Sequence, residues 1–135
     1  MMTLPKFPEV VKGWEVFLPP PSNRKKKWLS LNDRSHWSRS SPLTKYWRTI
    51  GYEICGAAGI PTLEQAWVIA NISFGDNRRR DVHNYMPTVK AVIDGCTDAG
   101  LWTDDRDGIL IGPDMRRVEI RRTIGIFLNV LEVRA

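Results

Sequence analysis

The segment from Gln65 to Gly100, QAWVIANISFGDNRRRDVHNYMPTVKAVIDGCTDAG, decides the fold that the sequence predicts. Its opening residues, Gln65–Phe74, are mostly apolar, with several β-branched and aromatic side chains, which is typical of a strand. The early part of this strand is apolar on both faces, so we expect it to lie in the centre of a sheet. Gly75, Asp76 and Asn77 then end it.

The second half of the same segment predicts a helix over residues 85–99. Four apolar side chains recur at helical spacing and mark the face that packs on the core: Met86, Val89, Ile93 and Cys96. Asn84 is the expected N-cap, and Pro87 is tolerated in the first turn. Gly100 is the expected left-handed residue that ends the helix.

The flanking segments add one more helix and several strands. The further predicted strands span residues 14–18, 108–112, 116–123 and 126–133, and the further helix spans 42–58 with Ser41 as its cap. Residues 1–12 are expected to form a loose lead-in, and Gly125 to turn the last two strands into a hairpin. This order predicts one α+β domain over residues 1–135, with a small mixed sheet and two main helices packed on it.

The composition narrows the class of partner. The 135 residues include 20 Lys and Arg against 15 Asp and Glu, a net charge of +5 that favours a polyanion such as nucleic acid. No apolar run approaches the length of a membrane span, and no export signal is recognised, so we expect a cytoplasmic protein, or one that acts in the host cytoplasm if a phage encodes it. Cys55 and Cys96 lack the spacing of a zinc site and are expected to be buried thiols.

Residues 20–41 form the least regular segment, a basic loop. It contains the run Arg24, Lys25, Lys26 and Lys27, which suits contacts to DNA phosphates or, equally simply, a solvated charged face. Trp28 and Trp37 lie in the same loop. Either ring can stack on an unpaired base or anchor the loop on the core.

The arrangement of charges around the second helix suggests phosphodiester chemistry. Arg78, Arg79 and Arg80 directly precede Asp81, and the turn after the helix carries Asp104 and Asp105. Mg²⁺ is commonly held by one or two carboxylates together with substrate phosphates, and arginines can grip those phosphates. A helix of this length spans about 22 Å, so spacing alone leaves open whether the acids meet. The other interpretation is a surface network of ion pairs.

The run RRRDVHNYMPTVKAVIDGCTDAGLWTDD resembles the signature region of the RusA family of Holliday junction resolvases, and FLPPPSN at residues 17–23 resembles the exit of that family's first strand. The resemblance implies a RusA-like fold and a homodimer that cuts four-way DNA junctions in recombination and repair, with Mg²⁺ as cofactor. It also implies roles for individual residues. Asp81 and Asp105, with Asp104 beside the latter, would hold the metal, Lys90 would be catalytic, and Asn84 would be the motif asparagine that contacts DNA.

Two departures from that signature matter. His83 stands where the family has a second aspartate; its nitrogen suits Mn²⁺ better than Mg²⁺, and we include it among the candidate metal ligands. Three additional residues lie between Asn84 and Lys90. Asp94 either replaces the missing carboxylate or, as we favour, pairs with Lys90 four residues earlier.

The sequence therefore predicts a metal-dependent, structure-selective endodeoxyribonuclease. One alternative is a branched-DNA-binding protein of the same fold that does not cleave, because His83 has weakened the metal site. Another is a basic interaction module whose acids are purely structural.

Overall fold

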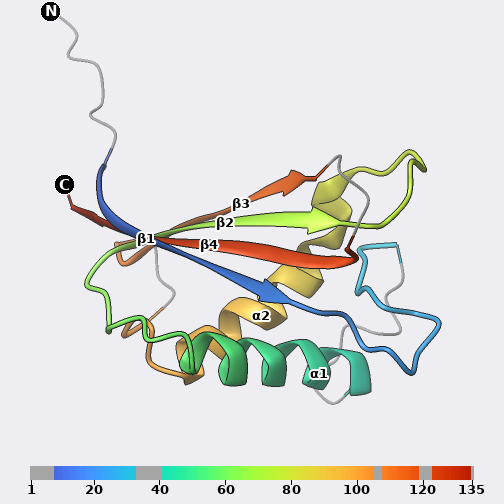
Figure 1. The fold of residues 1–135 in the computed structure, drawn as a ribbon, viewed down its shortest axis with the longest axis horizontal. Helices are drawn as coiled ribbons and strands as arrows, with labels where there is room; N and C mark the ends of the chain where they lie inside the picture. The colour runs from blue at the N-terminus through green and yellow to red at the C-terminus, as the bar shows by residue number, and fades with distance from the viewer. Residues whose placement is uncertain (1–7, 33–40, 105–107, 119–122, 135) are drawn as a thin grey trace, which may run out of the picture.

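Four strands form one mixed sheet in the order β1-β4-β2-β3 (Figure 1). The computed structural model describes residues 8–32, 41–104, 108–118 and 123–134. The strands are β1 (Glu9–Leu18), β2 (Ala66–Ser73), β3 (Leu110–Arg117) and β4 (Gly125–Arg134). Strand β4 is antiparallel to both of its neighbours, β1 and β2, whereas β2 and β3 are parallel.

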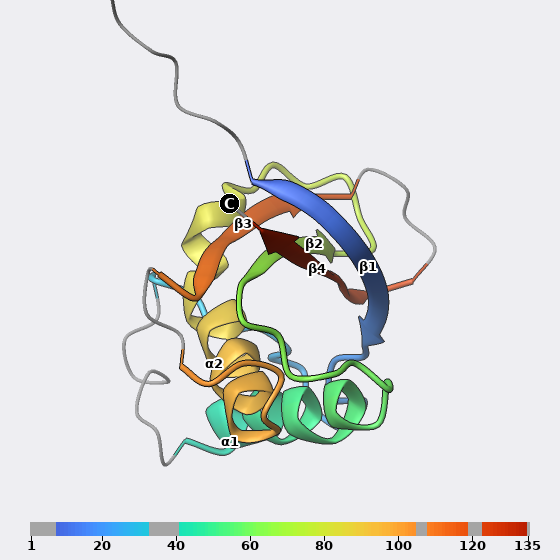
Figure 2. The ribbon, with the colours of Figure 1, turned by 90° about the vertical axis from the view of Figure 1, so that its left-hand side faces the viewer.

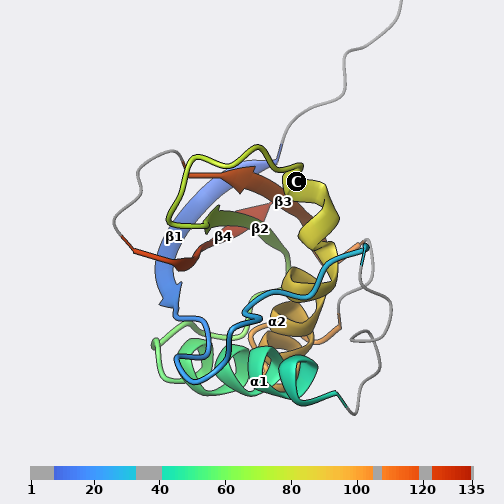
Figure 3. The same ribbon diagram turned by 90° about the vertical axis from the view of Figure 1, so that its right-hand side faces the viewer.

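Two helices cover the same face of this sheet, as Figures 2 and 3 show. They are α1 (Pro42–Ile50), which continues as the π-helical turn η2 (Gly51–Cys55), and α2 (Met86–Asp98), which follows the 3₁₀ turn η3 (Val82–Tyr85). Alternate side chains of β2 are fully buried on one face and half-buried on the other. This alternation confirms the α+β prediction of a small mixed sheet with two helices packed on it, and β2 lies between two strands as predicted.

The predicted caps are confirmed at two helix ends and wrong at a third. The Ser41 side chain accepts the Thr44 backbone N–H at the start of α1. Gly100, at φ +82°, ends α2 in a Schellman motif, with Leu101 N donating to Cys96 O. Asn84 does not cap α2. The helical path begins earlier, at η3, where the Asp81 side chain accepts the His83 N–H.

The predicted terminal hairpin is wrong, and so is the predicted lead-in over residues 9–12. These residues belong to β1, where Glu9, Val10 and Lys12 pair with the end of β4, while residues 1–7 lie outside the described residues. The two edges of β4 are occupied by β1 and β2, so β4 forms no hairpin with the strand before it. That strand, β3, combines parts of the predicted strands 108–112 and 116–123 and pairs with β2 instead.

Neither cysteine forms a disulfide, and both thiols are buried, as predicted. The Cys96 thiol donates a hydrogen bond to Cys55, and this bond together with burial raises the pKa of Cys96 far above its ordinary value. Within the described ranges, the helices are all too short or too polar to cross a bilayer.

Helices α1 and α2 approach each other through glycines. A Cβ built on Gly95 would lie 2.1 Å from the carbonyl oxygen of Arg48 and 2.8 Å from the backbone N of Tyr52. A Cβ on Gly51 would lie 2.5 Å from the carbonyl oxygen of Val92. Because these neighbours are backbone atoms, they cannot give way without moving a helix.

We expect Gly95→Ala to lower the free energy of unfolding by about 3 kcal/mol, because the added methyl group forces α1 and α2 apart. Urea unfolding followed by circular dichroism measures this loss. Gly108→Ala is the matched control, since its added Cβ meets nothing within 4 Å. Equal stability of the two variants would contradict the close backbone contact.

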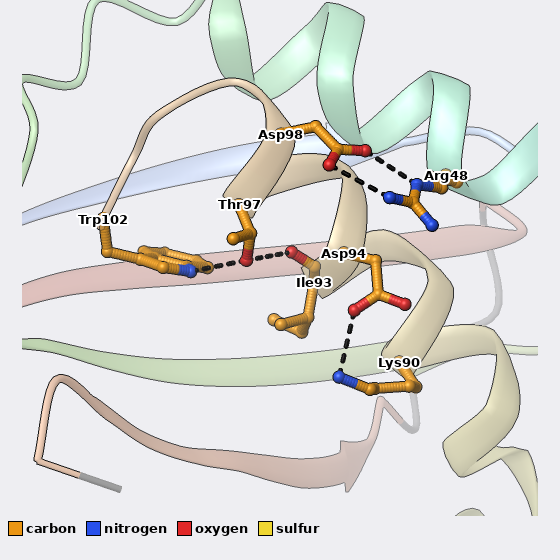
Figure 4. A network of polar contacts seen from close by, with 7 residues as sticks. All are labelled: Arg48, Lys90, Ile93, Asp94, Thr97, Asp98 and Trp102. Carbon is orange, nitrogen blue, oxygen red and sulfur yellow. Dashed lines mark hydrogen bonds and ion pairs between the residues drawn. The ribbon is translucent and has the colours of Figure 1, made fainter. Parts of the chain in front are cut away.

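A surface ion pair ties the same two helices together (Figure 4). Arg48 donates to both carboxylate oxygens of Asp98, at 2.7 and 3.0 Å. The hydrogen bonds from Arg48 lower the pKa of Asp98 below its ordinary value. An acid with a lowered pKa stabilises the folded state above its ordinary pKa, and this contribution is lost as the pH falls through the folded pKa.

Asp98→Asn is therefore expected to lower the free energy of unfolding at neutral pH by about 0.5 kcal/mol, a value typical of an exposed pair. The difference from the wild type should shrink as the pH falls below the ordinary range of aspartate pKa values. Urea midpoints across the acid range test this prediction, with Glu53→Gln as the control on the same surface. A difference that stays constant down to the lowest pH would argue against the ion pair as its cause.

Candidate metal and nucleic-acid site

The carboxyl ends of β2 and β3 share one edge of the sheet, because these two strands are parallel neighbours. Asp81 follows β2 through the loop of residues 74–81, and Arg117, the last residue of β3, lies opposite Ile72. The carboxyl ends of parallel strands are a common place for a ligand site in sheets of this kind. Asp81 and several arginine side chains therefore lie at this edge of the sheet.

The Asp81 carboxylate is open to solvent, with 64% of its side chain exposed. One of its oxygens, Oδ1, accepts the His83 backbone N–H at 3.0 Å and lies 3.3 Å from His83 Nδ1. Within the described residues, the other oxygen, Oδ2, has no protein partner. Asp81 can therefore offer one oxygen to an external cation while the first oxygen holds the turn.

The three consecutive arginines differ in their environment. Arg78 and Arg79 are exposed, as a contact to DNA would require. Arg80 is largely buried and donates to the Asp76 carboxylate at 3.1 Å. Arg80 is therefore held within the protein by Asp76, whereas Arg78 and Arg79 face solvent.

Lys90 lies in the second turn of α2, near the N-terminal end of this helix. Asp81 precedes the same end. The Lys90 amine is 3.0 Å from Asp94 Oδ1, which confirms the favoured pairing of these residues (Figure 4). Beside them is a partly apolar pocket of about 320 Å³. Its lining consists of Leu29, Leu31, Thr44, Pro87, Lys90, Ala91 and Asp94. Asp81 is not part of this pocket.

Asp104 lies beyond the opposite end of α2. The turn that carries it is fixed to the chain just before β2: Leu63 N donates to Leu101 O, and Leu63 forms a bridge with Trp102. The buried Trp102 indole also donates to the Thr97 hydroxyl on α2 (Figure 4). Thirteen residues of helix separate the two ends, which corresponds to about 20 Å (Figure 1).

Asp81 and Asp104 of one chain therefore do not meet. Asp105 lies outside the described residues, so its predicted metal role stays a prediction. Across the described part of the chain there is no group of three or more acidic, histidine or cysteine side chains placed to hold a metal ion. Asp81 and its neighbour His83 are the candidate ligands that the structure brings together.

The basic loop contacts the core at Trp28, and Lys27 beside it closes a turn within the loop. Trp28 stacks on Trp47 with ring centroids 5.3 Å apart, which supports the anchoring interpretation of Trp28. The Lys27 amine donates to the carbonyl oxygens of Pro21 and Arg24, so it closes a turn. Of the basic run, Arg24, Lys25 and Lys26 are exposed, and Trp37 lies outside the described residues.

Three hydrogen bonds join Leu29 and Leu31 of this loop to η3 and the first turn of α2. The buried Thr88 hydroxyl accepts the Leu29 N–H and donates to the Leu29 carbonyl, both at 2.8 Å. Leu31 N donates to the Asn84 carbonyl at 2.7 Å. The predicted DNA contact of Asn84 is not tested by this bond, which uses only its backbone.

Sequence reasoning did not assign Asp76 or Arg117 to the site. Asp76 was interpreted only as part of a strand-ending turn, yet it accepts hydrogen bonds from Arg80 and Arg117. Alternation in a strand places Arg116 and Arg117 on opposite faces, but it does not show what either residue faces. Only the parallel pairing of β2 and β3 brings Arg117 to this loop.

Comparison with known proteins identifies no family and no function for the chain. No protein-family model matches the chain, and neither does any curated protein sequence. The function must be inferred from the residues described above.

We expect Thr88→Val to lower the free energy of unfolding by about 3 kcal/mol, because it leaves both backbone groups of Leu29 buried without a partner. Thermal and urea unfolding measure the loss. Thr62→Val, which removes one exposed hydrogen bond to Gly100, is the control and should change stability by less than about 1 kcal/mol. A small effect of Thr88→Val would show that the loop is held by other contacts.

Proposed function

We propose that the protein is a metal-dependent endonuclease that cleaves branched DNA such as four-way junctions. The observation that carries this proposal is the exposed Asp81 carboxylate next to three arginines, at the carboxyl edge of the parallel pair β2–β3. The net charge of +5 and the resemblance of the surrounding signature to RusA resolvases support it. We propose that it acts in the cytoplasm, where its DNA substrate is accessible.

The residues at this edge fit a Mg²⁺ or Mn²⁺ ion in part. Asp81 would hold it through Oδ2, with His83 as a neighbouring nitrogen donor and the remaining positions filled by water and phosphate oxygens. Bound there, the ion would polarise a phosphodiester and acidify an attacking water. The chain itself contributes orientation: Arg78 and Arg79 hold the DNA backbone, and the His83 N–H fixes the Asp81 carboxylate.

In this proposal Lys90 does not bind the metal but acts on the reacting phosphate. It lies at the same end of α2 as Asp81, and its amine is held by Asp94. A lysine in this place would stabilise the charge that develops on the reacting phosphate. Its pairing with Asp94 would release when the phosphate provides a stronger anion.

The test is incubation of the protein with a synthetic four-way junction and Mg²⁺ or Mn²⁺. We expect cleavage by the wild type, and loss of cleavage with retained binding in Asp81→Asn, because the amide is a poorer metal ligand. Asp98→Asn makes the same chemical change far from Asp81 and should retain cleavage. Junction binding by the wild type without cleavage under either metal would favour the non-cleaving alternative. Absence of any preference for junctions would favour a basic interaction module.

We also propose a homodimer in which the partner's Asp104–Asp105 turn approaches Asp81. The separation of Asp81 from Asp104 along α2 supports this arrangement, because a partner's turn could supply the acid that Asp104 of the same chain does not bring to Asp81. Mixed dimers of Asp81→Asn and Asp105→Asn subunits provide the test. A shared site predicts that nicking returns in the mixture, since one of its two sites is intact. Continued inactivity of verified heterodimers would contradict the sharing.

A further inference from the structure

The guanidinium groups of Arg80 and Arg117 both lie over the aromatic ring of Phe74, at the start of the loop of residues 74–81. The Cζ atoms of Arg80 and Arg117 lie 4.4 and 5.4 Å from the centroid of the Phe74 ring. Phe74 is itself buried and packs against Tyr85 and Trp28, with centroids 4.7 and 5.3 Å away. The ring is therefore a fixed support for both arginines, which come from different elements of the fold.

Asp76 accepts a hydrogen bond from each of the two arginines. Its Oδ2 accepts from Arg80 Nη2 at 3.1 Å, and its backbone carbonyl accepts from Arg117 Nη2 at 2.9 Å. Its Oδ1 accepts the backbone N–H of Arg78 at 3.1 Å, which holds the carboxylate in place. Both guanidinium groups are thus oriented before any ligand arrives.

This cluster retains charge and hydrogen-bond donors for an anion. Two arginines and one aspartate leave a net charge of +1. Each guanidinium has five N–H donors, and its hydrogen bonds to other described residues use Nη2 alone. The side chains keep 18% (Arg80) and 25% (Arg117) of their surface exposed, so solvent reaches part of each group.

We propose that Arg80 and Arg117 form a clamp for one phosphodiester group of a nucleic-acid backbone, with Asp76 as a positioning residue. The planar fork of a guanidinium matches two phosphate oxygens, and two such forks can hold one phosphate from both sides. Because Asp76 and Phe74 already hold the arginines, little side-chain freedom is lost on binding. The inference rests on the proposed function only in taking DNA as the ligand. It does not require cleavage.

The first experiment measures binding of a fluorescein-labelled four-way DNA junction in EDTA, over a series of NaCl concentrations. Arg117→Gln should weaken binding about tenfold and reduce the slope of log K against log salt by about one phosphate contact. Arg116→Gln removes the same charge from the adjacent, exposed position of β3 and is the matched control. Its effect should be clearly smaller. Equal losses in the two variants would overturn the clamp, because general charge would then explain the binding.

The second experiment tests Asp76 through the sign of its effect. Asp76→Asn removes a negative charge, so general electrostatics predicts tighter binding of DNA. Positioning predicts weaker binding, because the amide holds the two guanidinium groups less firmly. Tighter binding would overturn the positioning role. Thermal unfolding of each variant verifies the fold, and Arg117→Lys, which keeps the charge without the fork, should restore only part of the lost affinity.

Because EDTA removes the metal, these results are independent of cleavage. Loss of the clamp would leave the nuclease proposal standing. Conversely, a protein that binds junctions without cutting them could still use the clamp.

Discussion

The parallel pairing of β2 with β3 is the constraint on which the rest of the structure depends. Parallel neighbours cannot be joined by a tight turn, so the chain must return along the sheet before β3 begins, and α2 is that return. Helix α2 can lie there only because Gly95 and Gly51 let it approach α1 at backbone distance. The consequence for function is direct: whatever precedes α2 lies at one edge of the sheet, and whatever follows it lies at the other. Asp81 and the Asp104 turn are separated for this reason.

The edge that carries Asp81 is also where the remaining candidate groups gather. Hydrogen bonds from Leu29 to Thr88 and from Leu31 to Asn84 hold the middle of the basic loop against η3 and the start of α2, so this part of the loop is attached to the same edge. Trp28, within the loop, touches the same Phe74 ring that supports the two arginines. Packing between aromatic rings therefore ties a positively charged loop to a positively charged turn. This continuity supports the proposal of an extended anion, such as a nucleic-acid backbone, as the ligand.

Local patterns in the sequence predicted the elements well and their partners poorly. The apolar run of β2, the stripe of α2 and the glycine that ends it are all set by residues within a few positions of one another, so they could be read directly. Which strands pair with one another depends instead on contacts between segments that are far apart in the sequence. Residues 126–133 were predicted as a strand, but the sequence did not show that this strand would insert between β1 and β2. For the same reason Asp81 and its arginines could be selected from the sequence, whereas Asp76 and Arg117, which are 41 residues apart, could not.

The identity of residue 83 bears on what this edge binds best. Counting Arg78, Arg79 and Arg80 against Asp76 and Asp81 leaves a charge of +1 in the loop. An aspartate at position 83 would cancel that charge and add a second oxygen ligand, a change that favours a hard divalent cation. A histidine adds no negative charge, so the loop stays positive, and its backbone N–H and Nδ1 both lie close to the same Asp81 oxygen. In the proposed site, this charge would favour a phosphate, whose oxygens would supply the metal ligands that Asp81 and His83 do not provide. A site built in this way would gain most of its metal affinity only after the nucleic acid has bound.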